Sequence, residues 1–180
     1  MYLGNHECRQ LTKSHNFWSD CIVKYDQEIY DLIMESFDKL PICAIVNGKF
    51  LAVHGGLSPE VLEVLDINRV NRFMEVPENG ALCDFLWSDP TENPSGVMSS
   101  PFEYNDSRGC AFYFGLDCTR QFLDQNKLLT VIRAHEVEFE GFKGFDWGTS
   151  LFPLVITVFS APNYCGFHGN KGAVLRIKVL

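Results

Sequence analysis

The sequence predicts an α/β domain, and three observations support this fold class. One long stretch has apolar residues at helical spacing, several short apolar runs have the length of strands, and polar motifs follow the ends of those runs. The chain has 180 residues, of which 46% are hydrophobic, and a formal net charge of -8. This length suits one globular domain or a part of a larger one.

The first predicted element is a helix over residues 17–40. Its apolar side chains recur at steps of three and four residues, and charged side chains lie largely between them. Pro41 ends the helix, because proline cannot continue one. Two short apolar runs follow, Ile42–Val46 and Lys49–Val53, and the Asn47-Gly48 pair between them predicts a β-hairpin.

The remaining predicted elements are shorter. Ser58-Pro59-Glu60 predicts a short helical turn, because serine caps helices and proline suits the first helical position, and Asp66 predicts the start of another. The segment Pro90–Asn105 is rich in Ser, Pro, Asn and Gly, which predicts an exposed excursion. A further helix and three further strands are expected at Asp117–Asn126 (helix), Leu128–Arg133, Leu154–Phe159 and Ala173–Val179 (strands).

Composition excludes several classes of function. The chain has 23 Asp+Glu against 15 Lys+Arg and no basic run, which argues against a nucleic-acid partner. No apolar stretch approaches the roughly 20 residues that cross a bilayer, and the N-terminus lacks the pattern of a signal peptide, so no membrane association is expected. We expect a cytoplasmic protein, with the nucleus as the alternative compartment. The seven cysteines include no C-x-x-C pair and predict neither a disulfide framework nor a zinc knuckle.

Three histidine motifs follow apolar runs or open a loop: Asn5-His6, His54-Gly55-Gly56 and Ala134-His135. Any one of these histidines alone is more often a hydrogen-bonded structural residue. Three of them, one beside an asparagine and one beside two glycines, favour a metal or phosphate site. The paired glycines are expected to let the backbone approach a ligand closely.

Six sequence blocks occur in an order that is typical of one family. They are LGNHECR (3–9), FLAVHGGLSP (50–59), LWSDP (86–90), NDSRGCAFYFG (105–115), VIRAHE (131–136) and VFSAPNYCG (158–166). With these blocks the chain resembles the phosphoprotein phosphatase family of serine/threonine phosphatases, and within it the calcineurin branch. Cys165 departs from that branch and is more like the type 1 and type 2A phosphatases. The resemblance implies the calcineurin-like metallophosphoesterase fold, a β-sandwich flanked by helices.

The resemblance also implies a reaction and its metal ligands. Members of the family hydrolyse phosphoserine and phosphothreonine in proteins with two metal ions that share an attacking water. Asn5, His54 and His135 would be ligands of the second metal, and this ligand set suits Fe, Zn or Mn better than Ca. His6 would bind no metal and would protonate the departing serine or threonine oxygen.

Other residues are assigned to phosphate binding or to structure. Arg108 matches the family's phosphate-clamping arginine, whose planar guanidinium can hold two phosphate oxygens. Tyr164 lies in a loop beside the family's active site and would either hydrogen-bond phosphate or pack there. Arg133 would either support the site residues from behind or form a structural ion pair. Asp84 and Asp89 are expected to have structural roles.

The family's two earlier motifs, Gly-Asp-x-His-Gly and Gly-Asp-x-x-Asp-Arg-Gly, do not occur in the sequence, and Leu3 stands where the family usually has arginine. Those motifs supply the first metal's ligands. We therefore expect residues 1–180 to be the C-terminal two thirds of a catalytic domain that is truncated at its N-terminus, as in an incomplete gene model. The implied partners are phosphoprotein substrates and, in a full-length protein, a calcium-binding regulatory subunit and calmodulin. The alternatives are a noncatalytic phosphatase-like scaffold and a metallophosphoesterase that acts on small phosphodiesters.

Overall fold

The computed structural model describes residues 2–148 and 152–178. Within these residues the strands form two sheets, a five-stranded mixed sheet of order β1-β2-β6-β8-β7 and a three-stranded sheet of order β3-β5-β4. The strands are β1 (Cys43–Val46), β2 (Phe50–Val53), β3 (Asp89–Pro90), β4 (Phe102–Tyr104), β5 (Phe112–Phe114), β6 (Thr130–Arg133), β7 (Phe142–Phe145) and β8 (Val155–Val158).

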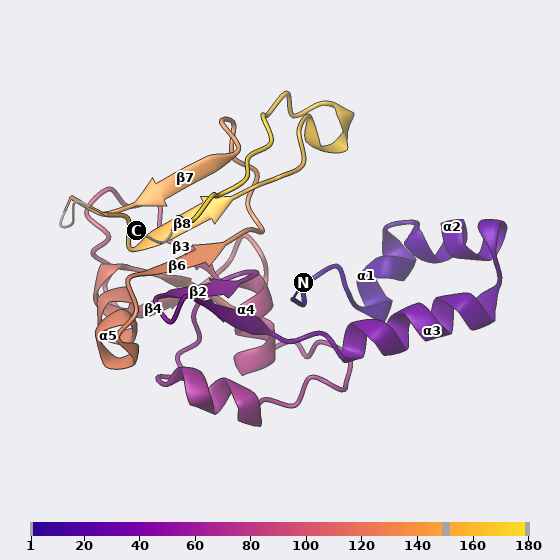
Figure 1. Ribbon diagram of the computed structural model, residues 1–180, viewed down its shortest axis with the longest axis horizontal. Helices are drawn as coiled ribbons and strands as arrows, with labels where there is room; N and C mark the ends of the chain where they lie inside the picture. The colour runs from indigo at the N-terminus through magenta and orange to yellow at the C-terminus, as the bar shows by residue number, and fades with distance from the viewer. Residues whose placement is uncertain (1, 149–151, 179–180) are drawn as a thin grey trace.

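Helices lie on the sheets and to one side of them. The α-helices are α1 (Arg9–Ser14), α2 (Phe17–Lys24), α3 (Gln27–Asp38), α4 (Ala81–Trp87) and α5 (Leu116–Asn126), and the 3-10 helices are η1 (Val64–Arg69) and η2 (Tyr164–Gly166). Figure 1 shows α1, α2 and α3 projecting as an arm from the body that contains the sheets. No helix in the described part of the chain is long and apolar enough to span a bilayer.

The prediction of a single helix over residues 17–40 is wrong, because the chain breaks between α2 and α3. Tyr25 has non-helical dihedral angles, with φ of -136° and ψ of -119°. The next residue, Asp26, caps α3, since its carboxylate accepts a hydrogen bond from the backbone N–H of Ile29 at 2.9 Å. Aspartate is among the best N-cap residues, so this break is stabilised. The two helices share a small core of Cys21, Tyr30 and Met34.

The predicted hairpin is confirmed. Strand β1 pairs antiparallel with β2, with Val46 opposite Phe50, and both residues of the Asn47-Gly48 pair have positive φ. Strands β6 and β8 lie within the two runs that were predicted as strands.

One other predicted element is wrong. Residues 173–178 of the expected strand Ala173–Val179 form no strand, and Val179 lies outside the described residues. The N–H of Ala173 donates to the carbonyl of Phe159, but Val174 is then 88% exposed. The short turn expected at Ser58-Pro59-Glu60 is present: the N–H of Val61 donates to the carbonyl of Ser58 at 3.4 Å, and the N–H of Glu60 donates to the Ser58 hydroxyl at 3.2 Å. The helix expected at Asp66 is present as η1.

Several short elements had no signal in the sequence. The segment Pro90–Asn105 was predicted as an exposed excursion, but it contains strand β4. The other elements that were not predicted are α1, α4, β3, β5 and β7. Helix α4 shows the reason, because five consecutive residues, Leu82 to Leu86, are buried. A short helix that is buried all round has no amphipathic period to detect.

All seven cysteines are free, as their spacing predicted. Four of them are buried and behave as small apolar side chains, namely Cys8, Cys21, Cys83 and Cys118.

The main core lies on one face of the five-stranded sheet. Alternate residues of its central strands, Leu51, Val53, Val131 and Val155, are fully buried in one cluster with apolar residues of α4 and α5. Strands β2, β6 and β8 are parallel neighbours. Their carboxyl ends therefore share one edge of the sheet, and the histidine motifs lie at that edge.

Gly55 and Gly56 were expected to let the backbone approach a ligand closely. In the structure, packing against other parts of the protein requires them. A Cβ atom on Gly55 would lie 2.6 Å from backbone atoms of Leu86 and Trp87, and one on Gly56 would lie 2.1 Å from the ring of Phe114. These distances are far below van der Waals contact. The turn after β2 thus packs directly on α4 and β5.

We expect Gly55→Ala to destabilise the fold by about 2 to 3 kcal/mol, because overpacking forces backbone to move. Urea unfolding of the chain measures this change. Gly48→Ala is the comparison, since a Cβ atom there meets nothing within 4 Å and adds only the strain of a φ of +62°. A loss for Gly55→Ala no larger than that for Gly48→Ala would contradict the packing explanation.

Asp84 of α4 is a buried carboxylate without a cationic partner in the described chain. Its side chain accepts a hydrogen bond from the Ser58 hydroxyl at 2.6 Å, while its Oδ1 is buried and has no hydrogen-bond partner among the described residues. Burial raises the pKa of Asp84 to about 6, with Ser58 opposing the rise and Glu60 adding to it. The folded state therefore favours the protonated acid.

This pKa predicts a pH dependence with a definite sign. The fold is favoured by protonated Asp84 below about pH 4, and that contribution is lost as pH rises to about 6. The free energy of unfolding of Asp84→Asn minus that of the wild type should therefore increase by about 2 to 3 kcal/mol between pH 4 and pH 7. Urea titrations at several pH values measure the difference, with Asp117→Asn at the exposed start of α5 as the comparison variant. A flat difference for Asp84→Asn would be inconsistent with the raised pKa.

Candidate active site

The turn that carries Asn5 is fixed at both ends. The N–H of Leu3 donates to the carbonyl of Pro41 at 2.8 Å, and the N–H of Gly4 donates to the Glu7 carboxylate at 2.9 Å. Leu3 is itself buried in the main core, so the residue that departs from the family pattern serves as an apolar anchor. Asn5 is held in a buried position as a result.

His54 and His135 follow neighbouring parallel strands. The N–H of Ala134 donates to the carbonyl of His54 at 3.0 Å, which extends the pairing of β2 and β6 up to the two histidines. His135 has a φ of +66°, a left-handed conformation that is uncommon for residues other than glycine, although Asn, Asp and His adopt it more often than the others do. This conformation turns the chain sharply after β6, and His135 lies beside His54.

Three polar side-chain atoms converge at this point. The Nε2 of His54 lies 2.7 Å from the Oδ1 of Asn5 and 3.1 Å from the Nδ1 of His135. Atoms that bind one metal ion through bonds of about 2.1 Å lie about 3 Å apart, so the arrangement fits a shared ion. No third His, Cys, Asp or Glu joins the two imidazoles in the described ranges.

Both imidazoles are in the neutral form that binds metal. Burial lowers the pKa of His54 to about 3, and the charge of Arg133 lowers it further. Burial also lowers the pKa of His135 well below its ordinary value, again with help from Arg133. The Nε2 of His135 is buried and has no hydrogen-bond partner among the residues described.

The converging atoms open into a cavity of about 820 Å³. All six residues predicted for the site line it: Asn5, His6, His54, Arg108, His135 and Tyr164. The ring of His6 contacts the ring of His15 at 5.3 Å between centroids, and the ring of Tyr164 contacts that of Phe159 at 5.1 Å. The structure thus brings the predicted residues together, while their individual roles stay predictions.

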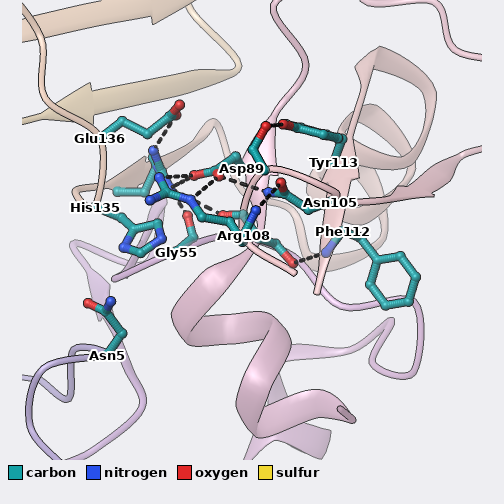
Figure 2. A network of polar contacts seen from close by, with 12 residues as sticks. Asn5, Gly55, Asp89, Asn105, Arg108, Phe112, Tyr113, His135 and Glu136 are labelled. Carbon is teal, nitrogen blue, oxygen red and sulfur yellow. Dashed lines mark hydrogen bonds and ion pairs between the residues drawn. The ribbon is translucent and has the colours of Figure 1, made fainter. Parts of the chain in front are cut away.

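Arg108 reaches this cavity from a polar network around Asp89, which Figure 2 shows. The carboxylate of Asp89 accepts from the Nε of Arg108 at 2.8 Å and from Arg133 at 2.7 Å. Burial opposes the charge of Arg108, but the hydrogen bonds and charge of Asp89 raise the pKa of Arg108 above its ordinary value. Arg133 also donates to the carbonyl of Gly55 and to Glu136, so it is a structural ion-pair residue that supports the site.

The other residues that line the cavity include Leu11, His15 and Trp87, which the sequence did not assign to it. The ring of Trp87 meets that of His135 edge to face at 5.2 Å. Leu11 lies in α1 and His15 follows it, and a helix of six residues is too short to be recognised by periodicity. Trp87 had a usable signal, because it lies within the LWSDP block.

The chain belongs to the calcineurin-like phosphoesterase family, whose model matches residues 1–139. It is 43% identical to serine/threonine-protein phosphatase 2B catalytic subunit A1 of Saccharomyces cerevisiae, over 98% of this chain and 34% of that protein. It is 44% identical to the serine/threonine-protein phosphatase 4 catalytic subunit of Eremothecium gossypii, over 97% of this chain and 53% of that protein.

A solved structure supports the same fold. It is a serine/threonine phosphatase from Saccharomyces cerevisiae with similarity to human phosphatase PP5, and it matches with a TM-score of 0.81 and 36% identity over 95% of this chain and 50% of that one. The expected metallophosphoesterase fold and the resemblance to the phosphoprotein phosphatases are confirmed. The chain spans about a third to a half of the length of these relatives.

The converging atoms predict one metal site. We expect the chain to bind Zn²⁺ or Mn²⁺, and His135→Ala to weaken binding at least about tenfold because one of two imidazole ligands is lost. Isothermal titration calorimetry measures the affinity. His168→Ala is the control, since this exposed histidine does not line the cavity. Equal affinities of His135→Ala and the wild type would exclude His135 as a ligand.

Proposed function

We propose that the protein to which this chain belongs is a serine/threonine phosphatase that hydrolyses phosphoserine and phosphothreonine in proteins with a metal-activated water. One observation carries the proposal. The Nε2 of His54 lies 2.7 Å from the Oδ1 of Asn5 and 3.1 Å from the Nδ1 of His135, and Arg108 lines the same cavity. A site of this kind combines metal ligands with a planar cation that suits a phosphate group.

Each residue has a distinct part in the proposed reaction. Arg108 binds two oxygens of the phosphate, and Tyr164 lines the same cavity, where its ring packs on Phe159. His6 gives a proton to the serine or threonine oxygen as the bond to phosphorus breaks. Trp87 packs on the ring of His135 and limits its movement.

Asn5, His54 and His135 would hold a metal ion, with Fe, Zn and Mn as the candidates that suit amide oxygen and imidazole. A bound ion of this kind supplies positive charge at the phosphoryl oxygens and lowers the pKa of water. We propose two such ions in the whole protein, of which this chain provides ligands for one. Phosphoproteins are the proposed substrates, and a calcium-binding regulatory subunit and calmodulin are proposed partners.

The second candidate function is a noncatalytic phosphatase-like scaffold. It is favoured by the ligand set, because the described residues bring two imidazoles and one amide to the ion and no further His, Cys, Asp or Glu. An exposed cavity with such a partial set can bind a phosphorylated partner without hydrolysing it.

Hydrolysis of a phosphoserine peptide with added Mn²⁺ separates the two functions. If the protein is an enzyme, His6→Asn should lower kcat by roughly 10² to 10⁴ and leave the bound metal unchanged. Release of inorganic phosphate measures turnover, and metal analysis of the same samples is the control. Peptide binding without any phosphate release would favour the scaffold, and full activity in His6→Asn would remove His6 from the mechanism.

A further inference from the structure

We propose that Asp89 is a positioning residue for phosphate binding, which fixes the orientation of the Arg108 guanidinium in the cavity. The inference rests on the proposed function, because it concerns the same phosphate. It differs from the structural role that the sequence predicted for Asp89. Four hydrogen bonds to one buried carboxylate carry it.

The carboxylate of Asp89 is almost fully buried and each oxygen has two donors. Its Oδ2 accepts from the Nε of Arg108 at 2.8 Å and from the side-chain amide of Asn105 at 2.9 Å. Its Oδ1 accepts from a terminal nitrogen of Arg133 at 2.7 Å and from one of Arg108 at 3.3 Å. The side chain of Asp89 is 3% exposed. Both oxygens are therefore fixed by the fold.

These bonds fix which edge of the Arg108 fork is available. An arginine has N–H groups on Nε and on two terminal nitrogens, arranged in one plane. Asp89 uses the edge formed by Nε and one terminal nitrogen. The opposite edge is left for a ligand, and Arg108, with 28% of its side chain exposed, lines the cavity beside His54 and His135.

A carboxylate next to a phosphate site would ordinarily repel the ligand, but Arg133, which also pairs with Glu136, offsets part of the charge of Asp89. Arg133 is fully buried and is itself held by the carbonyl of Gly55 at 2.6 Å and by Glu136 at 2.6 Å. Asp89 thus shares its charge between two guanidinium groups. Arg108 can keep its attraction for an anion while Asp89 holds it in place.

The backbone supports the same orientation. The N–H of Arg108 lies 3.1 Å from both the carbonyl and the side-chain oxygen of Asn105, and the amide nitrogen of Asn105 bonds to Asp89. Asp89 also pairs with Tyr113 in the β3–β5 ladder, which fixes the end of the loop that carries Arg108. Main chain and side chain of Arg108 are therefore both tied to Asp89.

Two measurements on the whole chain test the proposal. The first is the ¹⁵N NMR signal of the Arg108 Nε–H, assigned by its loss in Arg108→Lys, which reports hydrogen-bonded restraint without any metal or activity. The second is the affinity for inorganic phosphate in the presence of Mn²⁺. In Asp89→Asn we expect faster solvent exchange of the Arg108 Nε–H and phosphate binding weakened about tenfold. Asp84→Asn is the matched control, a buried aspartate that does not contact Arg108.

A double-mutant cycle separates positioning from a loss of structure. Arg108→Lys keeps the charge but loses the fork, so Asp89→Asn should weaken phosphate binding much less in that background. The Nε–H signal of Arg133, which donates to Gly55, should persist in Asp89→Asn if the fold is intact. If Asp89→Asn unfolds, the proposal is tested by the wild-type Nε–H signal of Arg108, which must be protected from exchange.

The remaining outcomes contradict either the proposed role of Asp89 or the proposed function. Unchanged or tighter phosphate binding in a folded Asp89→Asn would overturn the proposal, since Asp89 would then be structural or a competitor for Arg108. An unprotected Arg108 Nε–H in the wild type would also overturn it. Absence of phosphate binding by the wild type with a protected Nε–H would contradict the proposed function and leave the orientation by Asp89 supported.

Discussion

The buried ion pair between Arg133 and Asp89 is the contact on which the site depends. Arg133 ends β6 of the five-stranded sheet, and Asp89 begins β3 of the three-stranded sheet. The imidazoles come from the first sheet and Arg108 from a loop of the second, so this pair sets the distance between the two imidazoles and the Arg108 guanidinium. Loss of one partner of a buried pair leaves an uncompensated charge, which typically costs about 3 to 5 kcal/mol. The geometry of the site therefore depends on the contact that holds the two sheets together.

The parts of the fold that could be predicted are those with local signals. The Asn47-Gly48 turn and the apolar runs that became β6 and β8 contain their own periodicity and turn chemistry. The break between α2 and α3 at Tyr25 could not be predicted, because the apolar spacing continues across it. Only the N-cap at Asp26 marks the start of a new helix. The short strands β3, β4 and β5 exist because they pair with one another, which no local pattern encodes.

The site was more predictable than the fold around it. His54 and His135 directly follow apolar runs that form parallel neighbours, so a shared sheet edge places them together. The partnership of Asp89 with Arg108 and Arg133 spans 19 and 44 residues of sequence and joins separate sheets. Nothing in the block LWSDP indicates those partners, and Asp89 was expected to be structural only. Long-range pairing of charges was the missing information.

The left-handed backbone of His135 restricts which amino acids can replace it. Apart from glycine, the residues that adopt this conformation most readily are asparagine, aspartate and histidine. Substitution of His135 by asparagine or aspartate would therefore replace the imidazole by an amide or carboxylate oxygen and keep the turn. Cysteine at this position would introduce backbone strain. Position 54 is not among the residues with positive φ, so this restriction does not apply there. The two histidines are chemically alike, but the residues that could replace them without backbone strain differ.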